Sequence, residues 1–347
     1  MSDYARDSPS RRKLDFGIRI ALDSRLARCQ YSATQLRMKK IALLFAGQGA
    51  QAVGMGSELA GISPAARGVF EQADAVLGRS LSEIAWNGPL DQLTKTANAQ
   101  PALYVHGLAC LAALREAAGD FTIEAAAGLS LGEWTAHAAA STFDFATGLQ
   151  LVEKRGSYME AACEATAGAM AAMIGADESA VRALAADTDV DVANLNAPGQ
   201  IVISGEMAKV ELAVSLAKEH GIRRATLLNV AGAYHSRLMN SAYVQLGEAL
   251  LKAELQAPRF PVVSNVTGQL ADTLPEIRRT LRDQVTATVR WTDCMEWLLA
   301  RGCDLFIELG PGGVLAGLLQ RTRKGVDVVS VSDVASMQVA TAKLLEV

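Results

Sequence analysis

A serine lies between two glycines at residues 128–132, which read Gly-Leu-Ser-Leu-Gly and match the pattern G-x-S-x-G. Residues 124–128 predict a strand before Ser130, and residues 131–140 predict a helix after it. A sharp strand-to-helix turn exposes the serine hydroxyl, and the helix N-terminus behind it favours negative charge. The pattern alone is weak, but in this setting it indicates a nucleophile at Ser130.

A serine nucleophile needs a base, and the chain has 4 histidines. His106 lies inside an apolar helical segment, and His137 follows Ser130 along the predicted helix and points away from the turn. His220 ends a charged helix, where we expect it in solvent. His235 lies in a loop directly after a predicted strand, where catalytic residues collect. By elimination we predict that His235 is the base; the alternative is a loop histidine with one structural hydrogen bond.

Three further residues have backbone or side-chain groups that could assist such a nucleophile. The turn that contains Gln48 follows the first predicted strand and lacks the spacing of a phosphate-binding or dinucleotide-binding loop. We interpret its backbone N–H, with that of Leu131, as an oxyanion hole; a simple tight turn is the alternative. Arg155 could bind a carboxylate through two parallel hydrogen bonds, but from its position alone a surface salt bridge is favoured.

The composition excludes several classes of protein. The chain has 347 residues, 50% of them hydrophobic, with a formal net charge of -4. The chain therefore lacks the excess of basic residues that binding to nucleic acid or to a membrane surface requires. No apolar run is long enough to span a bilayer. The odd number of cysteines and the absence of a C-x-x-C pair predict free thiols in a reducing compartment, the cytoplasm. These cysteines are Cys29, Cys110, Cys163, Cys294 and Cys303.

The first 37 residues differ in amino-acid composition from the rest of the chain. They are rich in Arg and Ser and carry scattered Asp, and Met38 begins a segment that looks like a natural protein start. We predict that residues 1–37 form a disordered or dispensable extension; a transit peptide is the alternative, although such peptides are poor in acidic residues.

From residue 40 onward, the sequence predicts an α/β fold. Apolar runs at 40–47, 124–128, 260–268 and 304–313 predict buried strands, and residues 99–118, 146–163, 236–255 and 275–301 predict helices. Between them, residues 166–232 follow the order β-α-β-β-α-β, which is the ferredoxin-like split motif. We therefore predict one core from residues 38–165 and 233–347, with residues 166–232 inserted as a small subdomain.

Several segments, taken together and in this order, resemble the malonyl-CoA:acyl carrier protein transacylases of fatty acid synthesis. They include FAGQGAQAVGMG, NAQPAL, GLSLGEWTAH, LVEKRGSYM, NLNAPGQIVISG, YHSRLM, PVVSNVTG, VRWT and IELGPGGVLAGL. The resemblance runs from about Met38 to the C-terminus. It implies an α/β-hydrolase-like core with an inserted ferredoxin-like subdomain, and transfer of malonyl from malonyl-CoA to the phosphopantetheine thiol of an acyl carrier protein.

The resemblance also implies roles for individual residues. Ser130 would be the acylated nucleophile, and His235 its general base and later acid. The backbone N–H groups of Gln48 and Leu131 would form the oxyanion hole, and the carbonyl of Gln284 would orient the histidine.

The same resemblance implies a substrate pocket and a set of partners. Arg155 would hold the free carboxylate of malonyl, and Gln100 and Asn196 match positions that line the pocket. No metal or redox cofactor is expected, because the coenzyme A thioester and the carrier protein are substrates. We expect a cytoplasmic monomer that binds neither nucleic acid nor membrane.

Two departures from the family pattern keep other functions open. The family usually has His before the nucleophile, where this chain has Leu129, and Pro where it has Ala46. The alternatives are a polyketide-pathway acyltransferase with another extender unit, a serine esterase, and a non-catalytic relative that acts as a binding partner. An esterase is disfavoured because more than a hundred residues follow His235 and no HGGG motif is present.

Overall fold

The structure is a computed structural model that describes residues 39–346. The predicted extension, residues 1–37 with Cys29, lies outside the described residues. Among the described residues, no helix has both the length and the apolar character needed to cross a membrane.

The first of two sheets has four parallel strands in the order β2-β1-β7-β8. The strands are β1 (Ile41–Phe45), β2 (Ile123–Gly128), β7 (Leu305–Leu309) and β8 (Asp327–Val331). Every residue of β1 is buried, which is expected for a parallel strand covered on both faces. Leu43 and Phe45 pack into one apolar cluster and Ala42 and Leu44 into another, because alternate side chains point to opposite faces.

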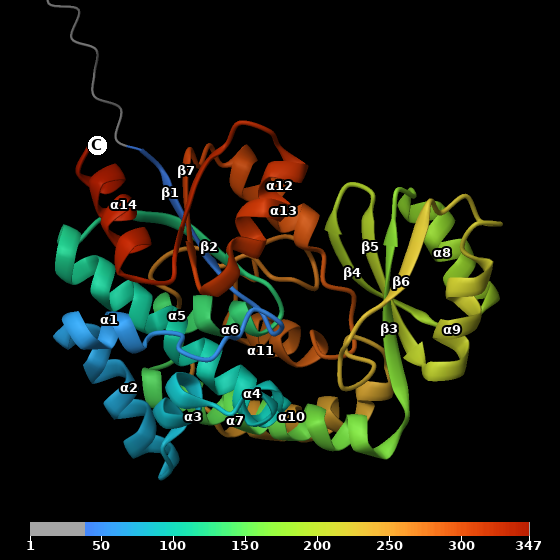
Figure 1. The fold of residues 1–347 in the computed structure, drawn as a ribbon, viewed down its shortest axis with the longest axis horizontal. Coiled ribbons are helices and arrows are strands. Elements are labelled where there is room, and N and C mark those ends of the chain that lie inside the picture. The colour runs from blue at the N-terminus through green and yellow to red at the C-terminus, as the bar shows by residue number, and fades with distance from the viewer. Residues whose placement is uncertain (1–38, 347) are drawn as a thin grey trace, which may run out of the picture. The chain divides into compact units, whose positions relative to one another are not determined.

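Helices cover both faces of this sheet (Figure 1). The long helix α5 (Thr96–Ala118) and α7 (Phe145–Ala165) supply one apolar cluster, and α12 (Trp291–Ala300) and α13 (Val314–Thr322) supply the other. The remaining helices around the sheet are α1 (Ser57–Ile62), α2 (Pro64–Leu77), α3 (Leu81–Asn87), α4 (Leu90–Thr94), α6 (Leu131–Ala139), α10 (Asn240–Lys252), α11 (Leu274–Asp283) and α14 (Val334–Leu345), with short 3-10 turns η2 (Arg237–Met239) and η3 (Pro311–Gly313).

The second sheet is antiparallel, in the order β4-β5-β3-β6. Its strands are β3 (Gly168–Ile174), β4 (Asp191–Ala197), β5 (Gln200–Glu206) and β6 (Arg224–Leu227). Helices α8 (Glu178–Asp187) and α9 (Met207–Leu216) pack on one face and form a separate apolar cluster with it (Figure 1). Its β4 edge meets the segment before α12, where Val289 donates to Ala193 O at 2.8 Å and accepts from Leu195 N at 2.9 Å.

Three segments differ from the elements that the sequence predicts. Residues 260–268 form isolated bridges at Val262 and Val263 instead of a strand, because the chain turns back at Gly268. The charged helix that the sequence extends to His220 ends at Leu216, and a tighter turn continues to Gly221, whose φ is 74°. The helical segment predicted over 275–301 is two helices, α11 and α12, separated by an irregular stretch that contains Gln284.

The glycines around the serine turn allow three backbone segments to touch. A Cβ at Gly128 would lie 1.9 Å from the carbonyl carbon of Gly132, and a Cβ at Gly132 would lie 2.0 Å from Phe45 O. One at Gly47 would lie 2.5 Å from Leu129 O. Strands β1 and β2 and helix α6 therefore approach as closely as they do only because these positions have no side chain.

We predict that Gly132→Ala lowers the free energy of unfolding by about 3 kcal/mol or more, since backbone and not a flexible side chain would have to move. Gly317→Ala in α13 is the matched control, because a Cβ there meets nothing within 4 Å. The control should stabilise the protein by about 0.5–1 kcal/mol, as alanine is favoured over glycine in a helix. Urea unfolding measures both variants, and equal stabilities would contradict this account of the turn.

Candidate active site

Ser130 occupies a strained turn between β2 and α6. Its φ is 53° and its ψ is -104°, a backbone conformation that non-glycine residues rarely adopt. Such a conformation costs about 1–3 kcal/mol and persists only where its surroundings hold it. The strand on one side and the helix on the other expose the serine oxygen at the end of the parallel sheet, as the G-x-S-x-G pattern predicts.

The buried side chain of Asn265 holds this turn from across the molecule. Its Oδ1 accepts from Ser130 N at 2.7 Å, and its Nδ2 donates to Gly128 O at 2.9 Å. The amide therefore bridges the backbone on both sides of Leu129. Sequence reasoning missed Asn265, because we interpreted the segment PVVSNVTG only as a strand.

His235 lies against the serine. Its Nε2 is 2.8 Å from Ser130 Oγ, and its Nδ1 is 2.8 Å from the backbone carbonyl oxygen of Gln284. A carbonyl oxygen only accepts, so Nδ1 carries the proton and Nε2 is free to accept from the serine hydroxyl. A backbone carbonyl thus takes the place that a carboxylate holds in a Ser-His-Asp triad.

The other histidines lie apart from the serine. His106 and His137 are buried in helices, where His106 contacts Cys110 and His137 bonds Thr142 Oγ1 at 2.9 Å. His220 is partly buried and lies 3.5 Å from an Asp187 oxygen. Elimination among the histidines therefore reaches the same residue that the geometry selects.

The environment of His235 keeps its imidazole neutral. Burial and, after it, the nearby positive charge of Arg155 lower its pKa from the usual 6.5 to about 4. The bond to the Gln284 carbonyl acts in the opposite direction. At neutral pH the ring is therefore in the form that accepts a proton.

Arg155 reaches the serine from α7 and is not the surface salt bridge that its position in the sequence favours. Its side chain is 1% exposed, and its Nη2 donates to Ser130 Oγ at 3.0 Å and to Gln284 Oε1 at 2.9 Å. Its Nη1 donates to Gln100 Oε1 at 2.7 Å. Within the described residues all its hydrogen-bond acceptors are neutral, and its Nε is buried with no partner. Burial lowers its pKa to about 10, and the guanidinium stays charged at neutral pH.

The two residues predicted to supply oxyanion donors are the first residue of α6 and a residue of the turn after β1. The N–H of Leu131 is the first of α6, and first-turn N–H groups have no partner within their own helix. Gln48 lies in the turn after β1, and its side chain is fixed by Gln100 Nε2 at 3.1 Å and by Thr96 Oγ1 and Tyr234 Oη, both at 3.3 Å. These bonds hold the Gln48 turn in place beside the cavity.

A cavity of about 450 Å³ opens onto Ser130 and His235. Gln48 and Asn196 line it, whereas Gln100 lies behind it and holds Gln48 and Arg155. The Oδ1 of Asn196 is buried with no partner in the described residues. The apolar side chains of the lining include Leu129, Met159, Met170, Val202, Leu228 and Val230.

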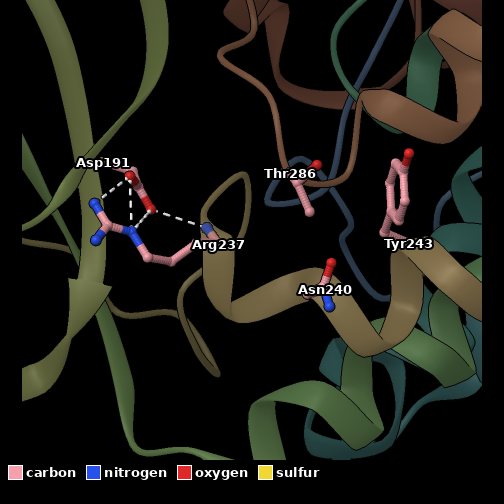
Figure 2. Close-up of a pocket in the computed structure, with 5 residues that line it drawn as sticks. All are labelled: Asp191, Arg237, Asn240, Tyr243 and Thr286. Carbon is pink, nitrogen blue, oxygen red and sulfur yellow. Dashed lines mark hydrogen bonds and ion pairs between the residues drawn. The ribbon is translucent and has the colours of Figure 1, made fainter.

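A second pocket lies behind the loop that carries His235 (Figure 2). Arg237 donates there to both carboxylate oxygens of Asp191 on β4, and its backbone N–H also donates to that carboxylate at 2.8 Å. Asn240, Tyr243 and Thr286 complete the lining. This ion pair ties the antiparallel sheet to the loop of the base.

The arrangement can carry out acyl transfer through a serine ester. A neutral histidine can take the serine proton, backbone N–H groups can stabilise an oxyanion, and a buried cation stands at the reacting oxygen. These parts define a serine-dependent acyl-transfer enzyme.

Comparison with known proteins agrees with this class. Residues 42–344 match the acyl transferase domain family. A malonyl CoA-acyl carrier protein transacylase of Bacillus subtilis is 41% identical over 316 residues, covering 89% of this chain and 98% of that protein. The crystal structure of an acyl-carrier-protein-S-malonyltransferase from Bartonella henselae is 39% identical, with a TM-score of 0.84 over 88% of this chain and 99% of that one. A structure of a type II PKS acyl-carrier protein in complex with its malonyl-transacylase is 36% identical, with a TM-score of 0.83 over 88% and 99% of the two chains.

The chain therefore belongs to the acyl transferase family and is an acyltransferase. The resemblance in the sequence to malonyl-CoA:acyl carrier protein transacylases is confirmed.

We predict that acylation of Ser130 is independent of pH near neutrality and is lost as the pH falls through about 4, the pKa of His235. Only the neutral ring accepts the serine proton, so the rate should fall about tenfold per pH unit below that value. Rapid pH jumps followed by quenched measurement of acyl-enzyme check this, with circular dichroism to confirm that the protein stays folded. A midpoint near 6.5, the usual histidine value, would contradict the buried environment.

Proposed function

We propose that this chain transfers malonyl from malonyl-CoA to the phosphopantetheine thiol of an acyl carrier protein through a malonyl ester on Ser130. One observation carries the proposal most directly: the buried Arg155 guanidinium lies on Ser130 Oγ, and its acceptors are all neutral. A buried cation whose hydrogen-bond acceptors are all neutral is stabilised by a ligand that brings a carboxylate. Malonyl carries one at its free end, whereas acetyl does not.

The first half of the reaction forms the serine ester. His235 Nε2 takes the proton of Ser130 Oγ, whose oxygen attacks the thioester carbonyl carbon. The N–H groups of Gln48 and Leu131 stabilise the resulting oxyanion; losing one such donor typically costs roughly 3–4 kcal/mol. The carbon–sulfur bond then breaks, and His235 returns the proton to the departing coenzyme A sulfur.

The second half of the reaction reverses these steps with a different thiol. The phosphopantetheine thiol of the carrier protein gives its proton to His235 and attacks the malonyl ester. The ester bond to Ser130 breaks, and the serine recovers its proton. Throughout both halves the Gln284 carbonyl holds His235 in the tautomer that accepts at Nε2.

The architecture supports a division into two folding units. We propose that residues 38–165 and 233–347 form an α/β-hydrolase-like core and residues 166–232 a ferredoxin-like subdomain. The order β-α-β-β-α-β from β3 to β6, with sheet order β4-β5-β3-β6, supports the second assignment. Further parts of the proposal are a cytoplasmic monomer, a reaction without a cofactor, and Gln100 and Asn196 as residues that shape the substrate pocket.

The proposal is tested by intact-protein mass spectrometry after brief mixing with malonyl-CoA. We expect a gain of one malonyl group in the native protein and none in Ser130→Ala, and loss of the adduct when a phosphopantetheinylated carrier protein is added. Steady release of free malonate without a carrier would indicate an esterase. No adduct in folded protein would indicate that Leu129 marks a non-catalytic relative.

We predict that Arg155→Ala lowers kcat/KM for malonyl-CoA by about a hundredfold and leaves the value for acetyl-CoA within a few-fold, because a charge-assisted hydrogen-bonded pair contributes roughly 1.5–3 kcal/mol. Arg155→Lys is the matched control: it keeps the charge but loses the fork of donors, so its preference should fall between those of the other two proteins. Parallel assays with both thioesters measure the ratio, and an unchanged ratio in the alanine variant would exclude the carboxylate clamp.

A further inference from the structure

The side-chain amide of Gln284 is held in one orientation by hydrogen bonds at both ends. Its Oε1 accepts from Arg155 Nη2 at 2.9 Å and from Trp134 Nε1 at 3.1 Å. Its Nε2 donates to Ser130 O at 2.9 Å, to Glu133 Oε2 and, at 3.4 Å, to Asn265 Oδ1. If the amide turned over, its NH2 group would face the two donors and its oxygen would face the acceptors. Glu133 and Trp134, together with the Ser130 carbonyl, therefore set which end of Gln284 meets Arg155.

Glu133 is fully buried in the first turn of α6, three residues after the nucleophile. Besides Gln284, its Oε2 accepts from the backbone N–H of Asn265 at 3.1 Å, the residue whose side chain holds the strained serine turn. Its Oε1 is buried with no partner in the described residues. Burial raises the pKa of this carboxyl to about 7. A group that is so costly to bury needs a structural or functional reason.

We propose that Glu133 is a positioning residue for substrate selection: it fixes the Gln284 amide so that its oxygen holds the Arg155 guanidinium at Ser130 Oγ. The proposal rests on the proposed preference for malonyl. It assigns to Glu133 no contact with substrate, and its effect passes from the carboxylate through Gln284 to Arg155. Trp134 supports the same orientation from the other end of the amide.

The test compares Glu133→Met, which removes the acceptor, with Glu133→Gln, which keeps an acceptor oxygen at nearly the same place. In the methionine variant we expect the malonyl-over-acetyl ratio of kcat/KM to fall about tenfold, as expected for losing one buried hydrogen bond. A higher KM for malonyl-CoA should account for most of the fall, and transfer of acetyl should change by less than about threefold. The glutamine variant should retain the native ratio within about threefold.

A buried carboxylate elsewhere in the same core provides the matched control. Glu308 on β7 is also fully buried, and it accepts from the backbone N–H groups of Leu315 and Ala316 at the start of α13. Glu308→Met should lower the melting temperature and leave the malonyl-over-acetyl ratio unchanged. Comparison of Glu308→Met with Glu133→Met therefore distinguishes the general effect of losing a buried carboxylate from the specific effect of losing the contact between Glu133 and Gln284.

A second variant keeps the test decisive if Glu133→Met does not fold. Trp134→Phe removes the indole N–H that donates to Gln284 Oε1, together with part of the ring, and it should lower the same ratio several-fold. Where Glu133→Met does fold, the effects of the two variants should be less than additive, since both act on one amide.

These measurements distinguish failure of the proposed function from failure of the positioning role of Glu133. Native protein without a malonyl preference would overturn the proposed function and this inference together. If Glu133→Met retains the native malonyl-over-acetyl ratio, only the positioning role of Glu133 is overturned. If that variant does not fold, a native ratio in Trp134→Phe has the same meaning.

Discussion

The rest of the site is arranged around one buried cation, the guanidinium of Arg155. Taking an arginine out of water is unfavourable unless its donors find acceptors, and Gln100, Gln284 and Ser130 supply them as neutral oxygens. A carboxylate from the protein in direct contact would stabilise the free enzyme more, but it would also occupy the donors that a substrate carboxylate needs. The neutral acceptors bind donors of Nη1 and Nη2 and leave the positive charge available to a ligand.

The nucleophile depends on a second constraint, the close approach of three backbone segments. Gly47, Gly128 and Gly132 let the Gln48 turn, β2 and α6 meet at distances that a Cβ would prevent. The positive φ of Ser130 follows from this crowding, and Asn265 offsets its cost by bonding the backbone on both sides. Because Glu133 contacts both Asn265 and Gln284, the strained turn and the surroundings of Arg155 share one buried network.

The parts of this site that a sequence can predict are those with a local signature. Ser130 was predicted from a turn pattern, and His235 from its place after a strand and by elimination; the structure places the two side chains 2.8 Å apart. Asn265 is 135 residues from the serine that it holds, and no spacing rule links the two positions. The buried state of Arg155 has no such signature either, since one arginine on an amphipathic helix looks the same whether it faces solvent or the interior. The strands β1, β2 and β7 were predicted because continuous apolar runs are typical of buried parallel strands, whereas 260–268 shows that such a run can also be a bridged loop.

The guanidinium that we propose to hold the substrate also influences the base. Burial and, after it, Arg155 lower the pKa of His235, so the free enzyme carries a weakly basic imidazole beside Ser130. In the proposed reaction, a malonyl carboxylate bound to Arg155 offsets this positive charge and weakens its effect on the ring. The imidazole then becomes a stronger base, and the imidazolium that forms during attack is less strongly opposed. A neutral acyl group leaves the charge of Arg155 uncompensated, so it loses both the binding contribution and this increase in basicity. Selection of a carboxylate-bearing substrate thus follows from the placement of one cation between the nucleophile and its supporting glutamines.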